Sequence, residues 1–358
     1  MTKQETKMMK GMAILLMLMH HLFILLDRII YGHFTYSFTV FGQNPAVYIG
    51  AFGKICVSLF FFLGGYGIYK SCEEHNFNLL ARLKKLYLSY WKVFVLFIPL
   101  AFLFLRLGWI TDWAVSRYRP FSFNALLQNF FGLSDSYNGE WWFLFSYAIA
   151  LCTYPLIVKI FEKHSFACNT VIVCAGSIFV TSVFPHIDML MTNTLYKTFF
   201  CQSAPFIACF WMGVAMAKSN MVDKLYVSLK RENMLNPLAD VVWMAVLVYL
   251  RENYFGDSFD IFTVPMLIVV VLDLVRHIAW MGKALRVLGM HSTNMWLCHS
   301  FFCYYFAPFA WLVSFTNSAV ISLLTLVALS LVGSVMIDRI WDAIGHIAQR
   351  IFLKKVIV

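Results

Sequence analysis

The sequence predicts an all-α integral membrane protein, a polytopic helical bundle of about ten spans with both termini cytoplasmic. Hydrophobic residues make up 61% of its 358 residues and charged residues 13%, whereas soluble domains hold roughly 45–50% and about 25%. The apolar residues also come in blocks long enough to cross a hydrocarbon core, which takes about 20 helical residues. So few polar residues cannot cover a globule, which excludes a soluble globular enzyme.

Each apolar block is expected to be a helix, because a spanning segment must satisfy its own backbone hydrogen bonds. The ten predicted spans are 11–30, 46–69, 87–107, 141–160, 166–184, 198–217, 237–250, 259–275, 288–311 and 318–337. The block at 237–250 is the shortest, and the stretch from Asp112 to Asn138 has room for a re-entrant or interfacial helix. No stretch between spans is long enough for a separate soluble domain, so we expect residues 1–358 to form one transmembrane domain.

The net charge of +10 is distributed unevenly along the chain. With the N-terminus inside and ten spans, most Lys and Arg residues fall on the inner side, as the positive-inside rule requires. The basic excess therefore sets topology and does not indicate a nucleic-acid partner. The nine cysteines contain no Cys-x-x-Cys pair and lie mostly within spans. We expect them to be buried free thiols and expect no metal site.

The first predicted span carries the most informative polar residues. Lys10 and His21 are eleven residues apart, which places them on one helix face about 16 Å apart along the axis. Arg28 follows on nearly the same face, toward the outer surface, whereas His20 points about 100° away. A neutral imidazole near mid-membrane can accept a proton from a hydroxyl, as acyl transfer to a sugar requires.

Other polar residues have two interpretations each. Lys54 either reaches outward to the membrane surface or faces a cavity. The cluster around Arg82 and Lys85, with Lys92 deeper in the helix, is either a topology signal or a clamp for a phosphorylated cytosolic ligand. The tryptophans after Glu140, including Trp142, are typical of interfacial anchors. His299 lies in a polar stretch that indicates either a cavity or a packed polar interface.

Taken together, these stretches resemble the integral-membrane acyltransferase family 3, whose members O-acylate envelope glycans and other exported molecules. The matching elements are Lys10 and His21 with ten residues between them, Phe61–Phe62–Leu63–Gly64–Gly65, Arg82–Leu83–Lys84–Lys85–Leu86–Tyr87–Leu88, Trp142–Phe143–Leu144, and Leu288, Gly289, Ser292 and His299. The chain departs from the family pattern in lacking a Ser after the paired phenylalanines. It has Lys85 in place of a second Arg, which keeps the charge but loses the bidentate fork, and it has no Pro after Tyr87.

The resemblance implies an acyl-CoA-dependent O-acyltransferase of the inner (plasma) membrane, without the extracellular hydrolase-like domain that some members carry. Acetyl-CoA or another acyl-CoA would be a co-substrate from the cytoplasm, and no tightly bound cofactor is expected. Its phosphates would be held by the basic cluster, and the acceptor would be a hydroxyl of a glycan or lipid-linked saccharide. The implied roles are as follows: His21, His20 and Lys10 catalytic; Arg82, Lys85 and Lys92 on the acyl-CoA; Lys54, Glu140, Trp142 and His299 on the acceptor.

Two other functions fit the same residues. A secondary transporter or proton-coupled permease could use the buried histidines and lysines as a proton relay, although residues 1–180 and 181–358 show no convincing internal symmetry. A non-catalytic scaffold needs no such stripe of basic residues and histidine. The sequence leaves open which acyl group moves, which sugar accepts it, and whether the protein forms a homodimer.

Overall fold

A computed structural model of the protein describes residues 1–29, 34, 39–40, 42–73, 75–187, 191–193, 196–197 and 203–356. Within these residues every regular element is a helix and there is no β-strand. The predicted all-α fold is therefore confirmed. Seven helical stretches in the described part are long and apolar enough to cross a membrane.

The helices divide into long apolar helices and shorter pieces that connect or complete them. The long helices are α1 (Lys3–Ile24), α3 (Ile55–Cys72), α4 (Leu79–Leu107), α7 (Trp142–Phe161), α8 (Phe166–Val183), α13 (Asp260–His277) and α17 (Ala319–Val356). The shorter α-helices are α2 (Pro45–Phe52), α5 (Val115–Tyr118), α6 (Phe123–Phe130), α10 (Ala204–Lys218), α11 (Met221–Arg231), α12 (Pro237–Leu250), α14 (Ala279–Met290), α15 (Ser292–Ser300) and α16 (Ala307–Ser314). Single turns are η1 (Leu26–Arg28), η2 (Asp112–Ala114), η3 (Gly139–Trp141), η4 (Phe184–His186), η6 (Arg251–Phe255), η7 (Asp257–Phe259) and η8 (Phe301–Tyr305).

Most predicted spans overlap a long helix, although the helix expected at 11–30 ends at Ile24 and the span at 46–69 is divided into α2 and α3. The span at 237–250 is a helix of just that extent, α12, and α10 covers most of the span at 198–217, of which residues 198–202 lie outside the described residues. The stretch 109–140 holds only the short elements η2, α5 and α6 and the start of η3. The last residue of the first predicted span, residue 30, also lies outside the described part.

The predicted single span at 288–311 is wrong, because this region is broken into α14, α15, η8 and α16. Backbone groups freed by the break are satisfied by the segment before α5. The Thr111 amide and hydroxyl donate to Tyr305 O at 3.0 Å and Tyr304 O at 2.7 Å, and the Ala307 amide donates to Trp109 O at 2.8 Å. Irregular backbone at membrane depth is tolerated when protein groups satisfy it in this way.

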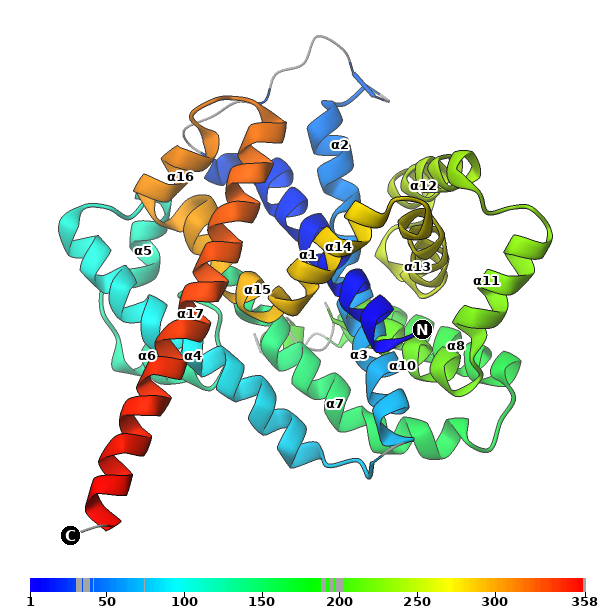
Figure 1. Ribbon diagram of the computed structural model, residues 1–358, viewed down its shortest axis with the longest axis horizontal. Helices are drawn as coiled ribbons and strands as arrows, with labels where there is room; N and C mark the ends of the chain where they lie inside the picture. The colour runs from blue at the N-terminus through cyan, green and yellow to red at the C-terminus, as the bar shows by residue number, and fades with distance from the viewer. Residues whose placement is uncertain are drawn as a thin grey trace.

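Two helix crossings form the centre of the bundle, and each depends on a pair of glycines. Helix α1 runs through the middle of the molecule beside α14 (Figure 1). A Cβ at Gly11 would collide with Leu285 O, and one at Gly289 would collide with Lys7 O. The same reciprocal arrangement joins α3 to α10, where Gly65 faces Phe210 O and Gly213 faces Phe62 O. Glycine permits such close backbone approach between membrane helices. Gly65 and Gly289, which belong to the family motifs, therefore have a packing role.

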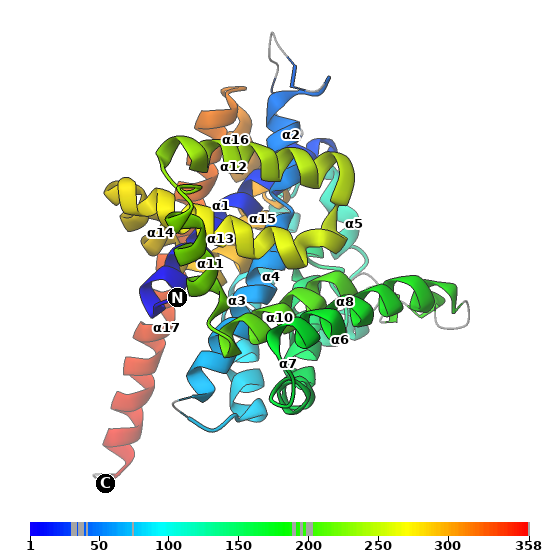
Figure 2. The same ribbon diagram turned by 90° about the vertical axis from the view of Figure 1, so that its right-hand side faces the viewer.

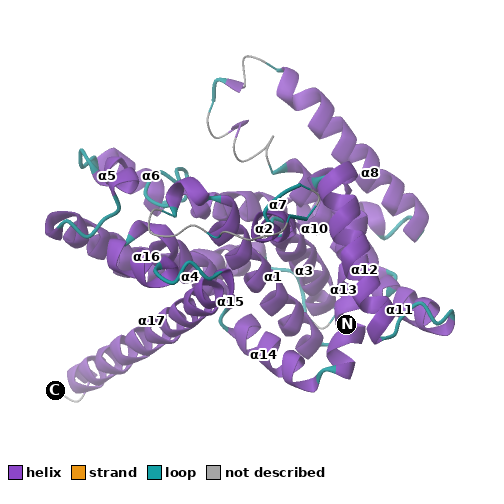
Figure 3. Ribbon diagram, turned by 90° about the horizontal axis from the view of Figure 1, so that it is seen from above, coloured by secondary structure: helices purple, strands orange, loops and turns teal. Residues whose placement is uncertain are grey.

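The peripheral helices cover this centre only partly. Helix α8 extends away from the body (Figure 2) and exposes Val171, Ile178 and Phe179. Helix α17 continues past the body toward the C-terminus (Figure 3). Exposed apolar side chains on helices of this kind are those expected to face lipid. The buried centre, with α1 at its core, is therefore where polar groups can be sheltered.

Candidate active site

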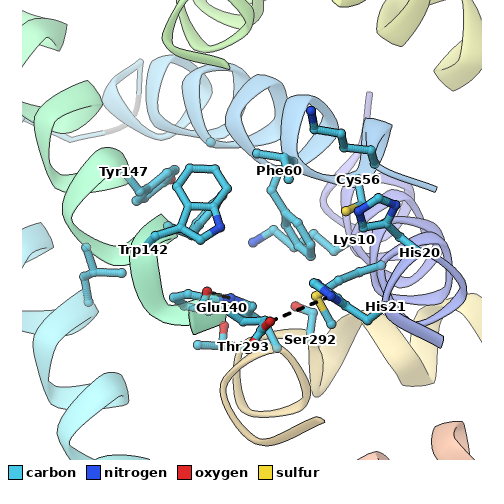
Figure 4. A pocket seen from close by; sticks show the side chains of 17 residues that line it. Lys10, His20, His21, Cys56, Phe60, Glu140, Trp142, Tyr147, Ser292 and Thr293 are labelled. Carbon is cyan, nitrogen blue, oxygen red and sulfur yellow. Dashed lines mark hydrogen bonds and ion pairs between the residues drawn. The ribbon is translucent and has the colours of Figure 1, made fainter. Parts of the chain in front are cut away.

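A cavity of about 270 Å³ lies between α1, α3, α7 and α15 in the buried centre. Its lining combines a few polar side chains with apolar and aromatic ones, as is typical of small-molecule sites. The lining residues are Lys10, Met17, His20, His21, Lys54, Cys56, Val57, Phe60, Gly64, Leu86, Glu140, Trp142, Phe143, Tyr147, Ser292, Thr293 and Trp296. Figure 4 shows the histidines on one side of this cavity and Trp142 and Tyr147 on the other.

The predicted shared face of Lys10 and His21 agrees with the structure, since both side chains line this cavity. Because eleven helical residues rise about 16 Å, the cavity extends a similar distance along α1. Lys10 lies in the electrostatic range of Lys85 and Lys7, so the Lys10 end of the cavity is the basic one. Helix α1 ends at Ile24, and Arg28 lies in the following turn instead of continuing the helix.

The central feature of the site is a buried carboxylate that faces His21. Glu140 Oε1 lies 4.0 Å from His21 Nδ1 and 3.1 Å from Arg28 Nη1, and the Tyr305 hydroxyl donates to Oε2 at 3.3 Å. Figure 4 shows the His21 ring and the Glu140 carboxylate facing each other. The 4.0 Å separation is longer than a hydrogen bond, and His21 Nδ1 is a buried atom with no hydrogen-bond partner. A small approach of the two groups would complete a carboxylate–imidazole pair that leaves Nε2 as the basic nitrogen.

The backbone that carries Glu140 is fixed by the residues around it. Asn138 caps the turn η3 by accepting from the Glu140 amide at 3.1 Å, and its own amide group donates to Ser300 Oγ at 2.7 Å. The Gly139 amide donates to the Tyr305 hydroxyl at 3.1 Å. The Trp141 indole donates to a backbone carbonyl of α15, so this residue is buried and is not the interfacial anchor that the sequence suggested. These hydrogen bonds fix the backbone from Asn138 to Trp141 and so hold the Glu140 carboxylate in position.

Backbone carbonyls define the tautomers of the two other histidines. His20 Nδ1 lies 2.9 Å from Gly50 O, and His299 Nδ1 lies 2.7 Å from Trp296 O. A carbonyl oxygen can only accept, so each Nδ1 carries the hydrogen and each Nε2 of the neutral ring holds a lone pair. The His299 ring lies 4.8 Å from that of His21, centroid to centroid, and its Nε2 is buried without a hydrogen-bond partner. His299 thus packs against His21 with its ring tilted by 42° and does not line the cavity itself.

The basic cluster lies outside the cavity lining. Arg82 donates to Ser71 Oγ at 2.6 Å and covers the Phe77 ring at 5.6 Å, which ties the start of α4 to the end of α3. Lys85 is exposed and Lys92 is half-buried. Only Leu86 of this segment reaches the cavity. The structure therefore places the cluster near the Lys10 end without bringing its cations together into a single clamp.

At the opposite end of the cavity, Lys54 is the residue that precedes α3. Its ammonium group lies 2.5 Å from Asp257 Oδ2, so it is paired across the bundle while it also lines the cavity. Trp142, the remaining residue assigned to the acceptor, lines the cavity and packs against Phe206. Of the ten residues assigned from the sequence, the structure brings Lys10, His20, His21, Lys54, Glu140 and Trp142 to one cavity.

Sequence reasoning assigned no role in the site to several residues that organise it, although Ser292 was already among the matching family elements. Tyr305 and Asn138 hold Glu140 in place, and Ser292 and Thr293 add hydroxyl groups to the cavity. The sequence signal was present in the dense polar run at the start of α15, but nothing in it indicates which side chains turn inward. The assignment of Glu140 to the acceptor also missed its position beside His21.

The eight described cysteines are free, and Cys201 lies outside the described residues. Cys152 and Cys168 are exposed, contrary to the expectation of buried thiols. In the part of the chain that the structure describes, no group of three or more His, Cys, Asp or Glu side chains could hold a metal ion.

The helical bundle thus places a mostly buried histidine beside a buried carboxylate on a mainly apolar cavity. A family model described as an acyltransferase domain, acyltransferase 3, matches residues 6–339. The chain therefore belongs to the acyltransferase 3 family and is a membrane acyltransferase. The match includes all of the cavity-lining residues. No curated protein matches the chain significantly.

Proposed function

We propose that the protein transfers an acyl group, acetyl in the first instance, from cytosolic acyl-CoA to a hydroxyl of an envelope glycan or lipid-linked saccharide. The observation that carries this proposal is the pair formed by His21 and Glu140 on a cavity that extends from the Lys10 end to the Lys54 end. In the inner membrane with a cytoplasmic N-terminus, the Lys10 end faces the cytoplasm and the Lys54 end faces outward.

In this mechanism His21 is the general base. Its Nε2 takes the proton of the acceptor hydroxyl while the hydroxyl oxygen attacks the thioester carbonyl carbon. The tetrahedral intermediate then collapses with cleavage of the carbon–sulfur bond, and the proton passes from His21 to the sulfur of the departing CoA. Glu140, fixed by Arg28 and Tyr305, orients the ring and stabilises the transient imidazolium. An ester and a free thiol are the only products.

Other cavity residues suit the remaining tasks. Ser292, Thr293 and Lys10 line the cavity and can donate hydrogen bonds to the developing oxyanion. The aromatic wall formed by Trp142 and Tyr147 excludes water from a thioester, which protects it against hydrolysis. On the cytoplasmic side, Arg82, Lys85 and Lys92 supply positive charge for the CoA phosphates.

The experiment measures binding and slow hydrolysis of radiolabelled acetyl-CoA by the detergent-purified full chain. We expect saturable binding that weakens at least tenfold in Arg82→Ala, and release of labelled acetate that is lost in His21→Ala. Arg106→Ala is the matched control for the first variant, because Arg106 is an exposed arginine at the other end of α4. His164→Ala, at an exposed histidine, is the control for the second.

Two outcomes would overturn the proposal. If neither acetyl-CoA nor a panel of longer acyl-CoAs binds, the acyl-CoA donor is wrong. If His21→Ala hydrolyses acetyl-CoA at the wild-type rate while remaining folded, the assignment of the base is wrong. The secondary transporter suggested by the buried histidines gains no support from the family match, which favours group transfer.

A further inference from the structure

A second pocket, of about 520 Å³, opens beside the Lys54 end of the catalytic cavity. It is formed by the C-terminal ends of α1 and α2 and by the turns η6 and η7 between α12 and α13. Its lining residues are His20, Ile24, Ala51, Lys54, Arg251, Glu252, Asn253, Tyr254, Phe255, Gly256 and Asp257. We call this space the outer pocket.

The outer pocket adjoins the catalytic cavity because His20 and Lys54 line both. His20 Nδ1 is occupied by Gly50 O at 2.9 Å, so the Nε2 lone pair of the neutral ring is the nitrogen left to accept a hydrogen bond. A molecule seated in the outer pocket can therefore place a hydroxyl against the histidine pair. It would do so from the side opposite the basic Lys10 end.

The charges that line the outer pocket neutralise one another. Asp257 lies 2.5 Å from the Lys54 ammonium and 2.6 Å from Arg251 Nη2, and Glu252 lies 2.6 Å from Arg251 Nη1. Each Lys or Arg in the described lining thus has a carboxylate partner. An anionic ligand would have to break one of these pairs to gain a contact, whereas a hydroxyl can share the carboxylate oxygens without displacing a cation.

The rim of the pocket supplies the other contacts that a sugar ring uses. Asn253 directs its amide hydrogens to Tyr48 OH at 2.9 Å and Tyr249 O at 2.8 Å, which leaves its carbonyl oxygen to accept from a ligand hydroxyl. Tyr254 is 67% exposed and Phe255 is 41% exposed. Exposed aromatic faces beside carboxylate and amide oxygens match a sugar, which has apolar C–H faces and a polar hydroxyl edge.

From this geometry we propose that the outer pocket is the acceptor subsite and that it takes a neutral, hydroxyl-rich saccharide. The proposal rests on the acyl transfer proposed above and adds the place and charge class of the acceptor. The saccharide lies on Tyr254, its hydroxyls contact Asn253 and Asp257, and one hydroxyl reaches the cavity past His20. Transfer then joins a donor and an acceptor that enter from opposite ends.

The test measures CoA release and acetyl ester formation by the purified full chain with acetyl-CoA and added oligosaccharides. The probes are neutral tetrasaccharides of glucose, galactose, mannose and N-acetylglucosamine, and the anionic probe is tetragalacturonate. We expect at least one neutral probe to accelerate CoA release about fivefold or more over water alone and to gain an acetyl ester. Tetragalacturonate should give no comparable acceleration.

Variants then locate the binding site of the best neutral probe. Asn253→Ala and Tyr254→Ala should each raise its half-saturating concentration at least fivefold, while Tyr254→Phe, which keeps the ring, should stay within twofold of wild type. Asn124→Ala, at an exposed asparagine of α6, is the matched control.

The outcomes distinguish the two proposals. If wild-type protein binds and slowly hydrolyses acetyl-CoA, but no neutral probe accelerates release, or tetragalacturonate is preferred, the charge class is wrong. If the probe's half-saturating concentration is unchanged in both alanine variants, the location is wrong. If wild-type protein neither binds nor hydrolyses any acyl-CoA, the proposed function fails first and the acceptor subsite falls with it.

Discussion

Two buried polar groups in this protein differ in how completely their atoms are paired. At the candidate active site, His21 Nδ1 and His299 Nε2 are buried without hydrogen-bond partners. Near the outer pocket, the 3% exposed Arg251 makes a two-pronged contact with the fully buried Asp260, at 2.8 and 3.1 Å, and Ser58 donates to the same carboxylate at 2.5 Å. Burial of polar groups costs free energy in both places, but only the second compensates for it internally.

This difference in pairing distinguishes groups that can contact a substrate from groups that stabilise the fold. In the network of Arg251, Asp260 and Ser58 the charged groups satisfy one another, and these contacts join the α12–α13 hairpin to α3. An incomplete group can persist at a cavity when a ligand supplies the missing partner during function. The first region should therefore be expendable for folding, and the second should not.

The largest effect is expected on turnover, when the incompletely paired histidine is replaced. His21→Ala should lower the turnover of acetyl-CoA by about 10²–10⁴-fold, the usual contribution of a positioned general base. Its free energy of unfolding should change little, because the side chain borders a cavity. Equilibrium unfolding in mixed micelles with a denaturing detergent checks the second point. A variant that loses activity and stability together would place His21 with the architectural residues instead.

A substitution in the fully paired network should instead lower the stability of the fold. Arg251→Met leaves Asp260 as an unpaired charge in the bundle, and breaking a buried pair in this way costs about 3–5 kcal/mol. The free energy of unfolding, measured in the same mixed micelles, should fall by this amount. Arg106→Met is the control, because Arg106 is exposed. A stable Arg251→Met protein with impaired turnover would instead put the network in the chemistry.

The sequence could predict the position of His21 better than the contacts of Arg251. Helical periodicity alone places Lys10 and His21 on one face, and the structure brings both to one cavity. Residues whose spacing lies within one helix are tied by geometry that the sequence carries directly. The seven long apolar helices follow from composition for a similar reason.

The contacts that complete each region lie beyond such local rules. Glu140 meets His21, and Asp260 meets Ser58, across helices far apart in the sequence. Which polar side chains turn toward each other depends on how the helices pack, which the local pattern does not specify. The break within 288–311 was missed because its apolar residues suit a continuous helix equally well. Only the backbone bonds from Thr111 and Ala307 reveal why it can end there.

A sharper test of the catalytic region changes charge while keeping shape. Glu140→Gln keeps the shape of the side chain and one oxygen acceptor, replaces the other carboxylate oxygen by an NH2 group, and removes the negative charge beside His21. Charge-assisted hydrogen bonds contribute about 1.5–3 kcal/mol, so acetyl-CoA turnover should fall about tenfold to a hundredfold. Glu162→Gln, at an exposed glutamate after α7, is the matched control. Wild-type turnover in Glu140→Gln would show that the carboxylate only supports the fold.

The smallest effect on stability is expected for an ion pair whose basic residue, unlike Arg251, is exposed. Lys230 of α11 lies 3.0 Å from Asp273 Oδ1, and its side chain is 41% exposed. The hydrogen bond from Lys230 to the Asp273 carboxylate raises the pKa of this lysine above its usual 10.5. Asp273 is buried but also contacts Tyr226 and His277, and the lysine itself is solvent-screened. Lys230→Met should therefore lower the free energy of unfolding by less than about 1 kcal/mol.

The contribution of the Lys230–Asp273 pair to the free energy of unfolding should decrease at high pH. A lysine with a raised folded-state pKa contributes its full stabilisation below the unfolded-state pKa, near 10.5, and loses it as the pH rises through the folded-state value. Unfolding curves of wild type and Lys230→Met should therefore differ at pH 8 and converge above that higher pKa. A loss as large as that of Arg251→Met at pH 8 would contradict the comparison. It would mean that pairing, and not burial, determines which polar groups the fold depends on.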